Sequence, residues 1–456
     1  MPSGGALAGS GRDRSLRGAV VGDSRSSFCY PRAVRTFGLT ALSLVAACRF
    51  NFEAQVPPPS DPDMPDAAVD APSDVPIDTP PPPPTVLGCT PQKFTVAATA
   101  APIRGITAVG TRRGYDVFVV DEAGIVTGYA YRFGMDNKLE PVPGTGIALP
   151  VPAATGPVGA LAVDPDAGDD VDVVIAVTYE LPAVATTATG AVVVPLNAQL
   201  QRVDAPEMAT MTDGVEGGPG TLAGGDHGTV AFAGRINDGT LGIAPVSRRG
   251  IVAPGAGRIL DTSGHSITKP SLVRNAAGYL AAWSDNESAP ENVVASILDE
   301  NLVARPPVII FRNPDHGSFS PASAYLASSD RYLFAWMEKS TRDVIKLTMR
   351  DGQLRDAPGL INLDVDGDVP VIAAGDRDFL IVWRDLAAGQ GKRIAAARVA
   401  PDGSFMLQDI TNTGGDAIGF DVVLHNGQNA LAWIEQAPSG SIALWVDALC
   451  PPPAAR

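Results

Sequence analysis

The sequence predicts an all-β protein assembled from repeated sheets, and three observations support this prediction. Four tryptophans recur at gaps of 53, 47 and 50 residues: Trp283, Trp336, Trp383 and Trp433. Each lies in a short apolar run, such as GYLAAWSD from Gly278 or DFLIVWRD from Asp378. Gly, Asp, Asn or Ser bounds these runs, which is typical of strands separated by turns. Self-similarity at a period of about 50 residues indicates a repeat architecture.

The repeat extends upstream without its tryptophan. Similar runs place Val120, Val177 and Ala233 at the tryptophan position, so that all seven anchor residues fall 47 to 57 residues apart. In the fifth unit we expect four strands, near Pro321–Leu326, Tyr332–Met337, Val344–Met349 and Leu360. Four strands in about 50 residues form one blade of a β-propeller. We therefore predict seven blades, with six or eight as alternatives because the first three units are degenerate.

The last unit lacks a fourth strand, and the start of the repeat region supplies a candidate. Only one strand, Ser441–Val446, follows Trp433, whereas Gln92–Val96 lies before the first unit. Pairing these two strands would close the ring and remove two unpaired sheet edges.

Two cysteines bracket the repeat region and suggest a covalent closure. Cys89 and Cys450 stand just outside the first and last strands. A disulfide between them would close a loop of about 360 residues and stabilise the fold by ~4 kcal/mol or more. The alternative is two unrelated thiols. The disulfide needs an oxidising compartment.

An apolar segment near the N-terminus indicates such a compartment. Arg32 and Arg35 precede the run Phe37–Ala47, which small residues end before Cys48. The segment resembles a bacterial lipoprotein signal with its lipobox. The resemblance implies a diacylglyceryl group on Cys48, and Arg49 beside it favours the outer membrane. A plain secretory signal and a short buried strand are the alternatives. The run is too short for a bilayer-spanning helix, which needs about 20 apolar residues.

These features divide the chain into four segments. Residues 1–47 form a leader and signal peptide. Residues 1–30 of this segment resemble neither a signal peptide nor a folded domain, which suggests a translation start nearer Val34. Residues 48–88 carry the lipid and form a disordered linker rich in proline and aspartate. In an extended polyproline conformation, at ~3.1 Å per residue, this linker would span up to ~120 Å. A proline-rich recognition peptide is the alternative for this linker. Residues 89–450 form the propeller, and residues 451–456 form a disordered tail.

Charge narrows the partners. The net charge is −16 and the isoelectric point is about 4.6. Nucleic acid binding needs clustered Lys and Arg, so we exclude it. We expect a monomer whose contact with the lipid bilayer runs through acylated Cys48.

Acidic residues recur two positions after the tryptophans, at Asp285, Glu338, Asp385 and Glu435. Glu122 has the same register in the first unit. Loops expected on the same face add Glu216, His265, His316, Asp364, Asp366, Asp368 and Asp416. Such a ring would attract a cation or a basic ligand. Alternatively, each acid accepts backbone N–H bonds within its own loop, as aspartate does in turns.

One segment resembles the start of a calcium loop, with candidate ligands at Asn362, Asp364, Asp366 and Asp368. Calcium loops alternate oxygen ligands and use glycine for a sharp turn, here Gly367. The match ends there, because Pro370 stands at position 9 and Ala373 at position 12. A second acidic loop, Asp164–Asp172, is a weaker calcium candidate. Apart from calcium we expect no cofactor, since the histidines lack zinc-site spacing.

Over residues 90–450 the repeat resembles the loosely defined propellers of secreted bacterial lipoproteins. It lacks the boxes of sialidase, WD and kelch propellers, and no nucleophile motif is present. We expect the tryptophans to pack between blades rather than to stack on sugars. The leading hypothesis is a non-enzymatic, membrane-anchored binding module for a protein or a glycan at the cell surface. The alternatives are a polysaccharide hydrolase or lyase using the recurring acids, and a structural surface protein.

Overall fold

The computed structural model describes part of the chain. The described residues are 92–95, 102–134, 138–156, 158–163, 170–180, 189–203, 221–224, 229–235, 241–247, 258–261, 270–285, 291–386, 393–410, 416–425, 428–436 and 442–448. All of them belong to the compact unit Asp78–Arg456. Every regular element among them is a strand, so the all-β prediction is confirmed.

The described strands of the N-terminal half form three antiparallel sheets. The first contains β2 (Ile103–Thr111), β3 (Gly114–Asp121), β4 (Val126–Phe133) and β5 (Leu139–Pro141), with β6 (Ile147–Ala148) also paired to β4. The second contains β7 (Gly159–Ala162), β8 (Val173–Glu180) and β9 (Thr189–Leu196). The third contains β10 (Thr221–Gly224), β11 (Thr229–Arg235), β12 (Leu241–Ser247) and β13 (Arg258–Asp261).

Three further sheets follow the same order along the chain. One contains β14 (Ser271–Asn275), β15 (Gly278–Asp285), β16 (Asn292–Asp299) and β17 (Val308–Phe311). The next has seven strands: β18 (Gly317–Leu326), β19 (Arg331–Lys339), β20 (Asp343–Asp351), β21 (Asp356–Ala374), β22 (Phe379–Asp385), β23 (Arg393–Val399) and β24 (Phe405–Asp409). The last contains β25 (Asp416–His425), β26 (Gln428–Gln436), β27 (Ile442–Ala448) and β1 (Gln92–Thr95).

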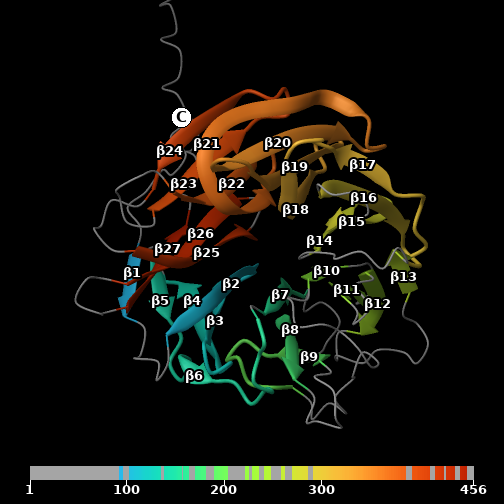
Figure 1. Cartoon of the computed structure of the whole chain (residues 1–456). Coiled ribbons are helices and arrows are strands. Elements are labelled where there is room, and N and C mark those ends of the chain that lie inside the picture. The colour runs from blue at the N-terminus through green and yellow to red at the C-terminus, as the bar shows by residue number, and fades with distance from the viewer. Residues whose placement is uncertain are drawn as a thin grey trace, which may run out of the picture. The chain divides into compact units, whose positions relative to one another are not determined.

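The predicted pairing between the two ends of the repeat region is present. β1 is antiparallel to β27, with Gln92 opposite Val446 and Thr95 opposite Ala443. Figure 1 shows β1 in blue beside β27 in red. An N-terminal strand therefore completes the last sheet, as the missing fourth strand led us to expect.

One 19-residue strand, β21, belongs to two four-stranded layers. Its first part pairs with β20, from Asp356 to Asp366, and its second part pairs with β22, from Gly367 onward. The change of partner falls at Gly367, where a Cβ atom would lie 2.4 Å from Cδ1 of Trp383 and 2.9 Å from the Arg384 carbonyl oxygen. Glycine at this position lets the strand pass close beside its neighbour.

The four tryptophans form the repeated core. Each is at most 1% exposed, and each packs with residues of its own sheet layer and of the layer before it. Trp283 clusters with Leu241 and Ile243 of β12, and Trp433 clusters with Leu380 and Val382 of β22. Trp336 and Trp383 occupy the corresponding clusters between them. The prediction that these rings pack between units is confirmed.

Three turns that follow the third strand of a sheet share one geometry. In each, an Asp or Asn side chain accepts two backbone N–H bonds, and a buried leucine three residues later adopts a left-handed conformation. The pairs are Asn197 with Leu200 (φ 58°), Asp299 with Leu302 (φ 60°) and Asp351 with Leu354 (φ 63°). A left-handed leucine is uncommon. Its burial and the paired hydrogen bonds together hold it there.

Candidate functional site

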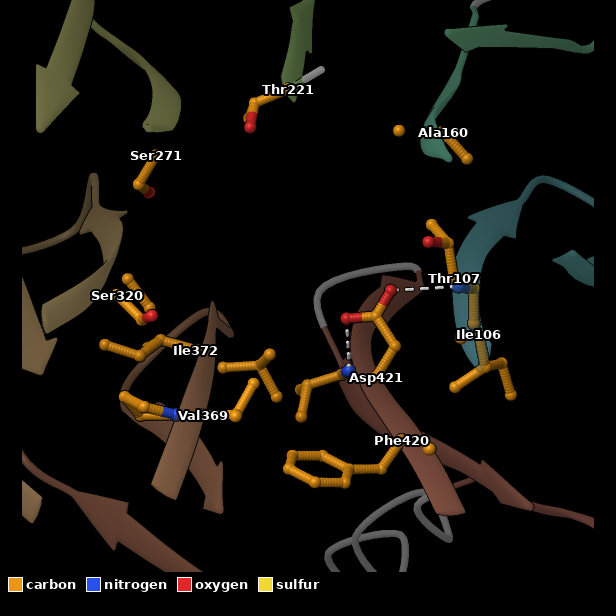
Figure 2. A pocket seen from close by; sticks show the side chains of 18 of the residues that line it. Ile106, Thr107, Ala160, Thr221, Ser271, Ser320, Val369, Ile372, Phe420 and Asp421 are labelled. Carbon is orange, nitrogen blue, oxygen red and sulfur yellow. Dashed lines mark hydrogen bonds between the residues drawn. The ribbon is translucent and has the colours of Figure 1, made fainter. Parts of the chain in front are cut away.

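One cavity of about 470 Å³ lies where the first strands of the sheets meet. Most residues that line it come from β2, β7, β10, β14 and β25, and from both β18 and β21 of the seven-stranded sheet, and Arg384 of β22 also lines it. Each sheet therefore contributes one inner strand, and the seven-stranded sheet contributes two. Figure 2 shows Thr107, Ser320 and Asp421 reaching this space from three of these strands. The volume lies in the range of small-molecule sites, about 300–1,000 Å³.

Hydrogen bonds join neighbouring inner strands around the cavity. The Thr107 hydroxyl donates to the Val158 carbonyl at 2.5 Å, and the Thr221 hydroxyl donates to the Pro270 carbonyl at 2.7 Å. The hydroxyls of Ser271 and Ser323 lie 2.7 Å apart. The Asp421 carboxylate accepts the Ala108 N–H at 2.9 Å, which links β25 to β2. These bonds fix the wall from which side chains reach the cavity.

Four inner strands carry a β-bulge near the anchor residue, and each bulge exposes a residue to the cavity. The residues are Arg104 of β2, Ser320 of β18, Val369 of β21 and Ile418 of β25. Bulges are common beside active sites because they redirect a side chain. In β18 the bulge is the pair Ser320–Pro321 opposite Trp336, and in β21 it is the pair Val369–Pro370 opposite Trp383. The strand register shifts by one residue across each pair.

The two proline-linked bulges are strained. Ser320 and Val369 have φ values of 50° and 48°. A β-branched residue at positive φ is an outlier, and a following proline disfavours helical conformations further. Prolines before the tryptophans are a sequence signal for these bulges. Pro321 and Pro370 stand 15 and 13 residues before Trp336 and Trp383.

Arg384 of β22 is held against the cavity wall by Asp368. Its Nε donates to Asp368 Oδ1 at 2.7 Å, and its Nη2 donates to Oδ2. The hydrogen bond to Asp368 raises the pKa of Arg384 further, so the guanidinium stays charged. Asp368 was expected to be a calcium ligand in a loop, and the structure places it in β21 as the partner of an arginine.

The other predicted calcium residues also lie in β21. Asn362, Asp364 and Asp366 are part of this extended strand rather than of a loop, and Asp366 forms an ion pair of 2.7 Å with Arg342. The side chains of Asn362 and Asp364 lie outside the described residues. Among the part of the chain that the structure describes, no group of three His, Cys, Asp or Glu side chains converges on a metal-sized space. In the second acidic loop, 164–169 fall outside that part.

The recurring acids do not line the cavity. Asp285, Glu338 and Glu435 are 9%, 7% and 5% exposed, while Asp385 is half-buried and Glu122 is exposed. Glu338 accepts the Asn313 side-chain N–H at 3.0 Å, and Glu435 accepts the Trp433 indole N–H at 2.9 Å. Both bonds come from side chains, which neither sequence interpretation of these acids foresaw.

Several predicted residues lie outside the described part of the chain. These are Cys48, Cys89, Cys450, Glu216 and His265, together with the leader, the linker and the tail. His316 is half-buried and Asp416 is exposed on β25, and neither lines the cavity. Within the described ranges, no helix has the length and apolar character for crossing a bilayer.

Comparison with known proteins adds only an architectural likeness. No family model matches the chain, and no curated protein matches it. A WD40 domain of Toxoplasma gondii coronin is similar at 10% identity, covering 80% of this chain and 86% of that one with a TM-score of 0.46.

Two further solved structures give TM-scores of 0.41 and 0.39. A puromycin-hydrolysing peptidase of Mycobacterium tuberculosis is 13% identical over 77% of this chain, which spans only 52% of the peptidase. The fucose-recognising Aleuria aurantia lectin, a six-bladed β-propeller, is 10% identical over 80% of this chain and all of the lectin chain. The described elements are all strands, and the inner strands of the sheets line a shared cavity.

Proposed function

We propose that this chain is a seven-bladed β-propeller that acts as a binding module through its central cavity. The observation that carries the proposal is the convergence of seven inner strands on one space lined by apolar residues and a few polar side chains. The division of β21 at Gly367 supports seven blades, because it splits the seven-stranded sheet into two four-stranded ones that share this strand. Pairing of β1 with β27 supports closure of the last blade.

The ligand is a glycan or a protein segment that enters the cavity. The lining mixes hydroxyls, guanidinium groups, one carboxylate and small apolar side chains, such as Thr221, Arg104, Asp421 and Ala160. Binding sites of this kind fix a ligand with a few polar groups in an otherwise apolar hollow. Glycan hydrolysis would need two carboxyl groups facing one cleft. Glu338 and Glu435 are buried, accept hydrogen bonds from side-chain N–H groups and do not line the cavity. Binding without catalysis is therefore the better-supported function.

The proposed setting is the cell envelope. A lipid on Cys48 would hold the propeller at the outer membrane, with residues 48–88 as a spacer, and a Cys89–Cys450 disulfide would reinforce the β1–β27 junction. Labelling of growing cells with a palmitate analogue should mark the wild-type chain and not Cys48→Ser. Mass spectrometry of unreduced peptides should find Cys89 joined to Cys450. An unlabelled chain, or free thiols at both positions, contradicts the respective part.

Binding is tested with arrays of glycans and peptides, probed with the full chain. Ala160→Trp places a large side chain in the cavity from β7 and should abolish the signal of any ligand found. Val303→Trp is the matched control, because Val303 is 55% exposed outside the cavity. The proposal fails if the array gives no ligand, or if Ala160→Trp binds as well as the control while its melting temperature is unchanged.

A further inference from the structure

The wall of the cavity has two chemically different sectors. On β21 and β25 the lining side chains are apolar apart from Asp421, and we call them the apolar sector: Val369, Pro370, Val371, Ile372, Ala417, Ile418, Phe420 and Val422. On β10, β14 and β18 apolar residues are interspersed with hydroxyl groups, which we call the hydroxyl sector: Thr221, Ser271, Ser320 and Ser323. Figure 2 shows Thr221 and Ser271 across the space from Phe420. A molecule in the cavity therefore meets an apolar surface on one side and hydroxyl groups on the other.

The apolar sector is partly open to the cavity. Val369 is 43% exposed, and Ile372, Ile418 and Phe420 are half-buried. Phe420 also packs against the core cluster that contains Trp433, and this packing supports the ring that lines the cavity. Ligand pockets are lined mainly by apolar and aromatic side chains, with a few polar groups that fix the orientation of the ligand. The apolar sector is therefore a contact surface for an apolar part of a ligand.

The charged groups at the wall balance each other. Arg104, Arg384 and Asp421 line the cavity, and Asp368 binds Arg384 through both carboxylate oxygens. These two arginines and two aspartates sum to zero charge. Each oxygen of Asp421 already accepts a backbone N–H at 2.9 Å. An ionic ligand would give up its hydration here without a net opposite charge to replace it, which disfavours such a ligand.

The hydroxyl sector keeps hydrogen-bonding capacity for a ligand. The Ser320 hydroxyl forms no hydrogen bond within the described part of the chain. Ser320 also has a strained φ of 50° before Pro321, and strained residues cluster at ligand sites. Thr221 donates its proton to the Pro270 carbonyl at 2.7 Å, so its oxygen can still accept a bond. A hydroxyl group on a ligand both donates and accepts, so it complements both side chains.

We propose that the cavity binds an uncharged sugar residue of a glycan, with its C–H face on Phe420 and its hydroxyl groups toward the hydroxyl sector. This assignment rests on the proposed binding function and names its ligand class. A sugar ring carries aliphatic C–H groups and hydroxyl groups on one small frame, so a single ring can contact both sectors. It also brings no charge to a wall whose own charges cancel.

The test is a calorimetric titration of the full chain with four neutral trisaccharides: maltotriose, cellotriose, mannotriose and chitotriose. At least one should bind, and its affinity should change by less than about twofold between ~0.05 and ~0.5 M salt, because salt screens only charges. Two matched pairs test charge directly. Chitotriose is compared with its deacetylated, cationic form, and methyl-esterified trigalacturonate with the anionic acid. The neutral member should bind about tenfold more tightly or better, since the ionic one loses hydration.

Variants of the two sectors test the orientation. Phe420→Ala should weaken binding of the neutral trisaccharide by about tenfold, because the sugar loses an apolar contact. Phe405→Ala is the matched control, since Phe405 is 38% exposed on β24 and does not line the cavity. Phe420→Leu keeps an apolar side chain and should retain part of the affinity. Ser320→Ala should weaken binding at an unchanged melting temperature, because it removes a hydroxyl that has no partner among the described residues.

The outcomes separate this assignment from the proposed binding function. A charged trisaccharide that binds as tightly as its neutral counterpart overturns the assignment, as does a Phe420→Ala variant that binds like Phe405→Ala. A peptide from the array whose signal is lost in Ala160→Trp leaves the cavity as a binding site and overturns the sugar. If no neutral trisaccharide binds, the sugar assignment fails, whereas the array decides the binding function independently.

Discussion

The indole N–H of Trp433 donates to the carboxylate of Glu435 two residues later, at 2.9 Å, and both side chains are buried. The two residues lie on the same face of β26, because side chains alternate along a strand. The indole nitrogens of Trp336 and Trp383 have no acceptor among the described residues. The repeated tryptophan and the acid after it therefore form a bonded pair at Trp433, and this contact is not shared by every copy.

Glu435→Ala should destabilise the chain by about 1–3 kcal/mol, because it leaves a buried indole N–H without its partner. Glu435→Gln should cost less, since an amide oxygen still accepts the bond. Urea unfolding followed by tryptophan fluorescence measures both. Equal destabilisation by the two variants would show that the hydrogen bond contributes little.

Gly367→Ala should destabilise the chain by about 1–3 kcal/mol, as overpacking does in a well-filled core. The added methyl group would lie 2.4 Å from the Trp383 ring, and β21 would have to shift where it changes partner. Gly224→Ala is the matched control, because its nearest neighbour would be a Leu161 methyl at 3.8 Å. A melting temperature unchanged by Gly367→Ala would show that the strand yields at this point.

Asp116 should make the stability of the chain fall as the pH rises. Burial raises the pKa of Asp116 from 3.8 to about 6, although Arg132 opposes the shift. The folded state then holds this proton more tightly than the unfolded state, so the contribution of Asp116 to stability is fully present below pH ~4 and is lost, by about 3 kcal/mol, as the pH rises to ~6.

Asp116→Asn removes this decline, because an amide does not ionise. The difference in unfolding free energy between Asp116→Asn and wild type should change across pH 4 to 6 in favour of the variant. Asp315→Asn removes an exposed charge instead and should follow the wild-type curve. Parallel curves for wild type and Asp116→Asn would contradict the buried-carboxyl account.

Asp299→Ala should cost about 1–2 kcal/mol, since the turn before β17 loses two side-chain hydrogen bonds to backbone N–H groups. The bonds run from Asn301 and Val303, each at 2.9 Å. Asp299→Asn should be nearly neutral, because Asn197 makes the same two bonds in its own turn. Thermal unfolding compares them, and an Asn variant as unstable as the Ala variant would point to charge instead.

The repeat could be predicted from the sequence because the same large buried side chain recurs at the same position of successive units. Trp283 and its counterparts recur at the period of the unit, and apolar strands surround them. The same reasoning found the strand that pairs with β27. These features depend on residues close together in sequence, or on a missing fourth strand that one other segment could supply.

The binding features were harder to foresee because they depend on register. Arg384 meets Asp368 only because the β21–β22 pairing places them opposite each other. A bulge of one residue changes which side chain reaches the cavity, and no hydrophobic pattern reports it. The segment around Asp366 was assigned to a calcium loop because alternating aspartates fit a strand and such a loop equally well.

The β1–β27 pairing also constrains how this protein is made. β1 is the first described strand to leave the ribosome, and its hydrogen-bonding partner is the last, some 350 residues later. Throughout synthesis the N-terminal strand must wait without pairing to the wrong edge. A product truncated before Ile442 would leave β26 with an open edge, which is a site for aggregation. The last described strand to be synthesised, β27, therefore covers the edges of both β1 and β26.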